Sequence, residues 1–221
     1  NLLVMNKIER LVLTALLDIP IVSPGDDIAT IIKTGLDNTD IDLESGDIIV
    51  ITHKIVSKSE NRFVNLRNVL PSITALEIAN EVDKDPRLVE VILSESVNVV
   101  AKTKGVLVTE HRLGYVLANS GIDASNIEQD NSDQNVLLLP IDPDGTCSVI
   151  RQSLECDTGV SLAVVINDSH GRAWRNGTVG VALGSSGIPS LLDLRGSSDI
   201  FGNELKTTEV GLADELSAAA S

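Results

Sequence analysis

The stretch GDIIVITHKIVSKSENR, which runs from Gly46 to Arg62, passes from an apolar run directly into polar and basic residues. Its apolar run Ile48–Ile51 follows a Gly-Asp pair, a pattern that predicts a buried strand. His53, Lys54 and Lys58 stand at the exit of this strand, and their side chains can bind phosphate or carboxylate oxygens. Taken alone, the three residues fit a solvated strand end equally well. In so acidic a chain, their gathering at one strand end favours an anion-binding site.

The composition limits both the fold and the ligands. With 221 residues, the chain can form one large domain or two small ones. Apolar residues make up 43% and aromatic residues only 2%, so we expect a core of Val, Ile, Leu and Ala. The formal net charge of −15 argues against general nucleic-acid binding, which needs a basic face, and against an anionic membrane surface. An anionic small substrate would need local cations or metal ions to offset this charge.

The cysteines and the apolar runs indicate a cytoplasmic protein without membrane contact. Cys147 and Cys156 show no CxxC spacing and form no disulfide framework, so we expect reduced thiols. No apolar run approaches the roughly 18 residues of a membrane span, and no signal peptide is apparent. The chain starts at Asn1 rather than Met and stops at Ser221 within a predicted helix, which is compatible with a longer natural chain at either end.

Predicted helices and strands alternate irregularly along the chain. A turn at Ser23–Asp27 indicates the start of a helix within Ile21–Lys33, and the segment PIDPDG leads into a helix that runs to about Cys156. Further helices are predicted at Ile73–Val82, Arg87–Leu93 and Leu212–Ala220. Strands are predicted at Ile48–Ile51, Val97–Val100, Val106–Val108, Tyr115–Ala118, Leu137–Leu139, Ser161–Ile166, Val179–Leu183 and, as an edge strand, Glu204–Val210. Without a regular βαβ alternation, the pattern predicts an α+β or irregular α/β fold.

Two polar segments offer oxygen ligands for a hard divalent cation. The first contains Asp123, in the polar stretch Asn119–Gln134, which is either a functional loop or a disordered one. The second is Asp168 with Ser169, directly after an apolar strand, where an α/β sheet commonly has its ligand crevice. The alternatives are an Asx-turn or helix cap for Asp123 and a simple turn for Asp168.

Other motifs carry less information. Arg172 and Arg175 flank Trp174, which suits anion recognition or a stacked ring, although surface ion pairs would explain the arginines equally well. The run Gly184–Gly187 is typical of a flexible loop. The histidines show no zinc-helix spacing, and the chain contains neither the P-loop pattern GxxxxGK[ST] nor the nucleophile pattern GxSxG.

Five segments, taken in order, resemble the coenzyme F420-0:γ-glutamyl ligase family across almost the whole chain. They are GDIIVITHKIVSKSENR, LANSGIDASNIE, LPIDPDGTCSVIR, VVINDSHGRAWRNGTVGVALGSSGI and DIFGNELKTTEVGLADELSAAA. The resemblance implies one domain, residues 1–221, with an unusual two-part α+β fold that forms homodimers. It implies an enzyme that adds L-glutamate to coenzyme F420-0, and then to F420-1, through γ-linked amide bonds. It also implies GTP as the co-substrate, Mg²⁺ or Mn²⁺ as the metal, and stimulation by K⁺ in some members.

The family's site residues carry over to matching positions of this sequence. Asp123, Asp168 and Ser169 match its metal ligands. The positions that match its nucleotide contacts are Ile19, Pro20, Ile21, Val22, His53, Lys54, Lys58 and Asn126. A role for Arg172 and Arg175 in holding the anionic substrate is a separate physical inference.

The resemblance implies that the F420-0 carboxylate attacks the γ-phosphate of GTP, and that the amine of glutamate then displaces phosphate. All reactants are anionic, so metals at Asp123, Asp168 and Ser169 and the charge of Lys58 would bring them together. Relatives continue past the position of Ser221 into a glycine-rich segment that completes their site, and we expect this chain to lack it. A non-catalytic nucleotide- or metal-binding relative and an amide ligase for another acid are the alternatives.

Overall fold

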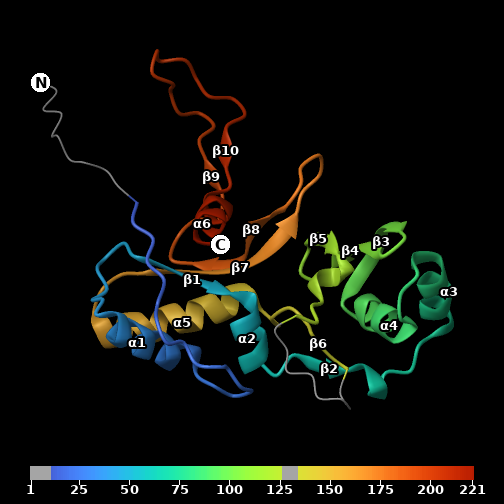
Figure 1. Cartoon of the computed structure of the whole chain (residues 1–221). Coiled ribbons are helices and arrows are strands. Elements are labelled where there is room, and N and C mark those ends of the chain that lie inside the picture. The colour runs from blue at the N-terminus through green and yellow to red at the C-terminus, as the bar shows by residue number, and fades with distance from the viewer. Residues whose placement is uncertain (1–10, 126–133) are drawn as a thin grey trace, which may run out of the picture.

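The computed structural model describes residues 11–125 and 134–221, and it consists of two parts with separate cores (Figure 1). The larger part contains a three-stranded sheet in the order β1-β7-β8. In this sheet β1 (Ile48–Thr52) is parallel to β7 (Ala163–Gly171), and β7 is antiparallel to β8 (Thr178–Ser186). Helices combined with several small sheets confirm the predicted α+β class.

Helices cover both faces of this sheet (Figure 1). On one face α5 (Pro143–Thr158) packs against β7 and β8, and α1 (Ile28–Thr39) packs against α5. On the other face α6 (Leu212–Ala220) lies over β8 and β7. α2 (His53–Ser59) follows β1 directly. The buried core of this part consists of aliphatic side chains and Cys147, as the low aromatic content predicts.

The smaller part packs two helices against a second sheet, in the order β3-β4-β5. Its elements are α3 (Ile73–Val82), α4 (Pro86–Ser94), β3 (Ser96–Thr103), β4 (Val106–His111) and β5 (Val116–Ala118). A further strand pair joins β2 (Phe63–Asn65) to β6 (Asn135–Leu137) and packs against α4 through a small core of its own. Two short 3₁₀ turns, η1 (Leu66–Asn68) and η2 (Asn119–Gly121), connect these elements.

Capping and pairing partners decide where the predicted elements begin and end. Asp27 accepts a hydrogen bond from the backbone N–H of Ala29 at 3.2 Å, so α1 begins at Ile28, within the range predicted for its start. The other predicted helices are confirmed, with shifts of one or two residues at some ends. The strand predicted at Leu137–Leu139 is wrong in position, because β6 pairs with β2 only over Asn135–Leu137.

A narrow arm projects from the larger part between β8 and α6 (Figure 1). Its base is the antiparallel pair β9 (Leu192–Asp193) and β10 (Glu209–Val210). The edge strand predicted at Glu204–Val210 is therefore wrong over most of its length. Earlier in that range, the structure has only an isolated bridge between Glu204 and Ser198.

β7 continues beyond Ile166, where its apolar run ends. A register shift between Ile166 and Asn167 interrupts the ladder, and β7 then stays paired with β8 as far as Gly171. Asp168 and Ser169 therefore belong to a strand, and the prediction that the strand ends before them, at Ile166, is wrong. The predicted flexible loop Gly184–Gly187 is also wrong over most of its length, because β8 remains paired through Ser186.

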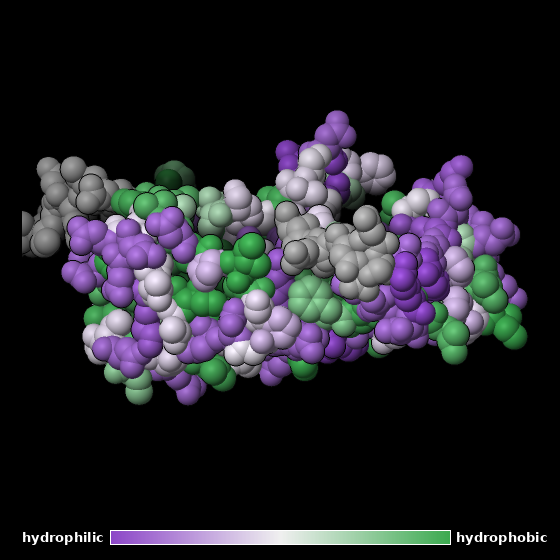
Figure 2. All heavy atoms as spheres, turned by 60° about the horizontal axis from the view of Figure 1, so that its bottom comes forward, coloured by the Kyte–Doolittle hydropathy of each residue, from purple (hydrophilic) through white to green (hydrophobic). Residues whose placement is uncertain are grey.

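The surface mixes hydrophobic and hydrophilic residues. Figure 2 shows one face, on which groups of hydrophobic residues are interspersed with hydrophilic ones over both parts. Within residues 11–125 and 134–221, no helix is both long enough and apolar enough to cross a bilayer.

Candidate active site

The predicted site residues gather where β1 ends beside β7. The parallel register pairs Thr52, the last residue of β1, with Asn167 of β7. Parallel strands leave their carboxyl ends on the same edge of a sheet, and ligands commonly bind there. β7 runs on past this edge, whereas the chain after Thr52 turns directly into α2. The first residues of α2 therefore lie next to the polar half of β7.

Asp168 lies between two imidazoles from different elements. Nε2 of His53, the first residue of α2, is 3.3 Å from Oδ1 of Asp168. Nε2 of His170, two residues further along β7, is 3.3 Å from Oδ2. Residues i and i+2 of a strand share a face, which explains the second contact. The backbone N–H of Ser169 also donates to Oδ1, at 2.7 Å.

These contacts keep Asp168 ionised although its side chain is only 13% exposed. Burial alone would raise the pKa of this carboxyl group. The imidazoles of His170 and His53 and the backbone N–H of Ser169 outweigh burial and hold the pKa of Asp168 well below its usual range. Asp168 is therefore a carboxylate available to a cation at neutral pH.

Asp123 is held by neighbours of a different kind. Nζ of Lys54 lies 2.8 Å from its Oδ2. Ser125 donates its backbone N–H to Oδ1 at 2.6 Å and its hydroxyl to Oδ2 at 2.9 Å, so Asp123 also makes the Asx-turn that the sequence offered as an alternative. Burial would raise the pKa of Asp123, but Lys54 and Ser125 outweigh it and lower the pKa.

The first turn of α2 therefore contacts both carboxylates that were predicted to bind metal. His53 faces Asp168, and the adjacent Lys54 faces Asp123. Their carboxylate oxygens, together with the Ser169 hydroxyl, are the hard donors that Mg²⁺ and Mn²⁺ prefer. Among the residues that the structure describes, no group of three or more His, Cys, Asp or Glu side chains is already arranged around a metal position. The donor chemistry fits a hard cation, and binding would require the carboxylates to adjust.

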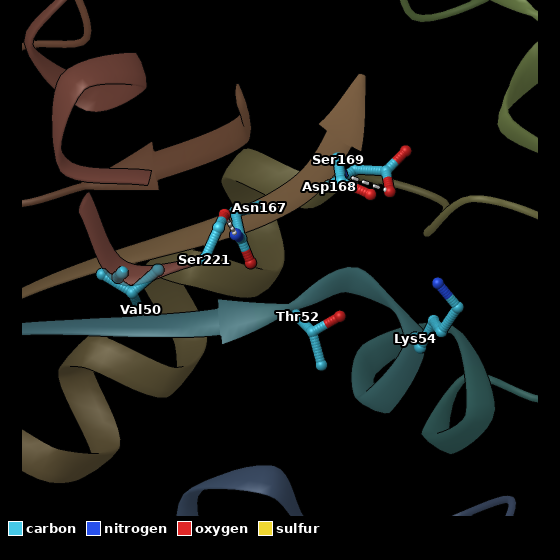
Figure 3. Close-up of a pocket in the computed structure, with 8 residues that line it drawn as sticks. Val50, Thr52, Lys54, Asn167, Asp168, Ser169 and Ser221 are labelled. Carbon is cyan, nitrogen blue, oxygen red and sulfur yellow. Dashed lines mark hydrogen bonds between the residues drawn. The ribbon is translucent and has the colours of Figure 1, made fainter. Parts of the chain in front are cut away.

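Two cavities of about 330 Å³ each adjoin at this edge and share Thr52 and Lys54. The first is lined by Val50, Thr52, Lys54, Asn167, Asp168, Ser169, Ala220 and Ser221. Figure 3 shows the Lys54 amine extending from α2 toward the Asp168 carboxylate on β7, with Thr52 at the end of β1. The second is lined by Pro20, Ile21, Val22, Thr52, Lys54, Ile55 and Lys58.

The structure thus brings together most of the predicted nucleotide contacts. Pro20, Ile21 and Val22 come from the segment before α1, and they face Lys54 and Lys58 of α2 across the second cavity. Ile19 does not line this cavity. It is half-buried, and its Cδ1 lies where a side chain at Gly35 of α1 would stand, so it packs against that helix.

Two further predicted residues lie elsewhere, and a third is not described. The predicted contact Asn126 falls outside the described residues. Arg172 and Arg175 are exposed in the turn that joins β7 to β8, around the fully exposed Trp174, and neither lines either cavity. Their proposed role in binding an anion remains a prediction.

The sequence reasoning missed several residues of the site. Thr52, Asn167 and Ser221 line the cavities, and the Asn167 amide donates to the Ser221 hydroxyl at 3.2 Å, which joins the end of α6 to β7. Thr52 could have been found, because it directly precedes the predicted pair His53-Lys54. Nothing local signals Ser221, since only the packing of α6 on the sheet brings it there.

The family model and the curated proteins that this chain matches all concern glutamate ligases of coenzyme F420. Residues 16–221 match the family model described as F420-0:Gamma-glutamyl ligase. The chain is 46% identical over 202 residues to the coenzyme F420:L-glutamate ligase of Methanothermobacter thermautotrophicus, covering 91% of this chain and 79% of that protein. It is 44% identical over 179 residues to the protein of the same name from Methanocaldococcus jannaschii, covering 81% and 70%. The protein so named from Archaeoglobus fulgidus is 36% identical over 203 residues, covering 92% and 78%.

Proposed function

Because this chain belongs to the F420-0:gamma-glutamyl ligase family, we propose that it joins L-glutamate to coenzyme F420-0, and then to F420-1, through γ-linked amide bonds. The observation that carries the proposal is the pair of adjoining cavities that share Thr52 and Lys54. One is lined by residues that match the family's nucleotide contacts, and the other by Asp168 and Ser169, which match its metal ligands. A ligase that couples phosphoryl transfer to amide formation needs these two functions side by side.

GTP is the proposed co-substrate, with its phosphates toward Lys54 and Lys58. Both lysines line the second cavity, which also contains Pro20–Val22, and Lys54 lines the first cavity as well. Lysine ammonium groups are compact charges that attract phosphate oxygens. Mg²⁺ or Mn²⁺ held by Asp123, Asp168 and Ser169 would supply further positive charge at the phosphates. K⁺ stimulation, a homodimer and a cytoplasmic location belong to the same proposal.

The proposed reaction has two steps. A carboxylate oxygen of F420-0 attacks the γ-phosphorus of GTP, the bond from that phosphorus to the bridging oxygen breaks, and GDP leaves with the electron pair. The amine of glutamate then attacks the acyl carbon of the acyl phosphate, phosphate leaves, and the nitrogen loses a proton. Every reactant is an anion and the chain carries a net charge of −15, so cations in the site must offset repulsion before either step can occur.

The alternatives differ in chemistry rather than in site. A non-catalytic relative would bind nucleotide and metal in the same cavities without forming the acyl phosphate. An amide ligase for another acid would use the same nucleotide chemistry with a different carboxylate. The arginines proposed to hold the acid substrate line neither cavity.

The test is a glutamylation assay of the full-length protein with F420-0, L-glutamate, GTP and Mn²⁺, read by mass spectrometry. We expect a mass gain of one or more glutamyl units that disappears when metal is omitted and falls when ATP replaces GTP. Measurable GTP binding with no mass gain would favour the non-catalytic relative. Glutamylation of a competing acid in preference to F420-0 would favour an amide ligase for another acid.

A further inference from the structure

We infer that His53 and His170 are positioning residues that hold the Asp168 carboxylate in the orientation in which it binds a divalent cation. The inference rests on the proposed function, because that proposal assigns a cation to Asp168. It gives His53 a different role from the nucleotide contact expected from sequence. It also assigns a role to His170, for which the sequence predicted none.

The Asp168 carboxylate is contacted by one imidazole on each side. The two imidazoles come from separate elements, α2 and β7, and each faces a different oxygen of Asp168 at 3.3 Å. A carboxylate oxygen has two lone pairs. One imidazole on each oxygen therefore fixes the plane of the carboxylate. Because Oδ1 also accepts from the backbone N–H of Ser169, the lone pair left for a cation is on Oδ2. Asp168 itself lines the first cavity, where such a cation would stand.

A buried hydroxyl favours the tautomer of His53 that this role needs. Nδ1 of His53 lies 3.5 Å from the hydroxyl of Ser57, one turn further along α2, and both side chains are buried. A hydroxyl that donates to Nδ1 leaves the proton of a neutral imidazole on Nε2, which is the atom that faces Asp168. Such outer partners commonly set the tautomer and orientation of groups around a metal.

Both Nε2 atoms are buried yet lack an aligned hydrogen bond. The His53 side chain is 1% exposed, so its Nε2 has no access to water, and Asp168 is the acceptor it faces. A buried donor without a partner destabilises the folded chain, so two such donors directed at one carboxylate indicate that the orientation of this carboxylate matters. A small rotation of Asp168 is the adjustment that would align them.

Adjacent residues of α2 therefore divide two tasks. Lys54 lines both cavities, whereas His53 lines neither and points to Asp168. A side chain that is 1% exposed has no surface to offer to a nucleotide. The task of His53 in the site is thus to act through Asp168.

The smaller part of the molecule provides a matched control. His111 is also fully buried, its Nε2 also lacks an aligned hydrogen bond, and it faces a carboxylate, Glu95, at 3.4 Å. His111 lines neither cavity. If imidazole–carboxylate contacts served only stability here, substitutions of His111 and His170 would have the same kind of effect.

The experiment measures Mn²⁺ affinity of the full chain from the electron paramagnetic resonance signal of free Mn²⁺, with and without GDP. The variants are His53→Ala, His170→Ala, His170→Gln and the control His111→Ala, with Asp168→Asn as the reference for loss of the ligand. Thermal unfolding of each variant in metal-free buffer reports stability separately. His170, whose side chain is 19% exposed, is the position at which substitution perturbs the core least.

We expect His53→Ala and His170→Ala to weaken Mn²⁺ binding by about tenfold, the lower end of what outer partners of metal ligands typically contribute. His170→Gln should restore most of the affinity, because its amide can donate from near the position of Nε2, and His111→Ala should leave it unchanged. Wild-type Mn²⁺ affinity in both His53→Ala and His170→Ala would overturn the inference. A loss of Mn²⁺ affinity in His170→Gln or in His111→Ala as large as that in His170→Ala would overturn it too. A wild-type chain that binds no Mn²⁺ under either condition would overturn the metal part of the proposed function, and the inference with it.

Discussion

Asp168 is the residue on which the proposed chemistry depends most. It is mostly buried, ionised and placed at the wall of the first cavity. Replacing it by Asn removes the charge but keeps the size, so we expect metal-dependent glutamylation to fall by on the order of 10²–10³-fold, comparable to the loss of one stabilising group in an active site. The fold should remain intact. Glutamylation rates across a Mn²⁺ series, with circular dichroism melting as the check on folding, measure both. Unchanged activity at saturating Mn²⁺ would remove Asp168 from the metal site.

Single residues of the site differ in how far they can be predicted from sequence. Lys54 and Lys58 stand out because cations at a strand exit are unusual in an acidic chain, and both line a cavity. The contact between His170 and Asp168 could not be predicted, because it requires both residues to share one face of a strand. The polar run Asn167–Ser169 indicated a turn instead, since apolar periodicity, the main signal for a strand, stops at Ile166.

At the scale of elements, the extension of β7 depends on its partner β8. Residues of β8 continue to pair with the polar half of β7, Asp168 with Val181 and His170 with Val179. Such pairing is a property of two segments together, which explains why a reading of each segment alone ended β7 too early. Where local signals were strong, as with the Ser72 cap before α3 and the Pro86 start of α4, the predicted elements are confirmed.

Gly184 of β8 permits the close approach of α5 to the sheet. A Cβ at this position would lie 2.5 Å from the carbonyl carbon of Pro143 and 2.7 Å from the backbone nitrogen of Asp144. We expect Gly184→Ala to lower the free energy of unfolding by about 1–3 kcal/mol, because the backbone of α5 must shift to admit the methyl group. Urea denaturation measures this change. Gly171→Ala is the matched control in the same hairpin, since a Cβ at this position would have no atom within 4 Å outside its own and the two adjacent residues. Equal urea midpoints for Gly184→Ala and Gly171→Ala would show that the close approach of α5 does not require Gly184.

At the scale of the whole molecule, the α+β class follows from the sequence but the joint between the two parts does not. Glu95, which follows α4, accepts hydrogen bonds from Arg62 at 2.8 Å and from Arg112 at 3.1 Å. Arg62 also donates to the carbonyl of Leu139, and Arg112 to that of Ile141, so both grip the segment that leads into α5. With 32 acidic and 17 basic side chains in the chain, nothing in their order along the sequence selects these partners.

The charge of Glu95 should therefore stabilise the molecule in a way that depends on pH. Burial would raise its pKa, but His111, Arg62 and Arg112 outweigh burial and lower the pKa from 4.5 to about 2. A carboxyl group whose pKa is lower in the folded state stabilises that state fully above its unfolded pKa, and the contribution is lost as the pH falls toward the folded pKa. Glu95→Gln should accordingly be less stable than the wild type at pH 7, by on the order of 3 kcal/mol.

Urea unfolding of both proteins at a series of pH values measures this difference directly. We expect the gap between wild type and Glu95→Gln to be constant from neutral pH down to about 4.5 and to shrink below it, as Glu95 of the wild type takes up a proton. Glu81→Gln is the control, because its ion pair with Lys102 lies in the same part but is far more exposed and should contribute little. A gap that persists unchanged below pH 4.5 would show that Glu95 acts through packing rather than charge, and no gap at pH 7 would show that the joint does not need its charge.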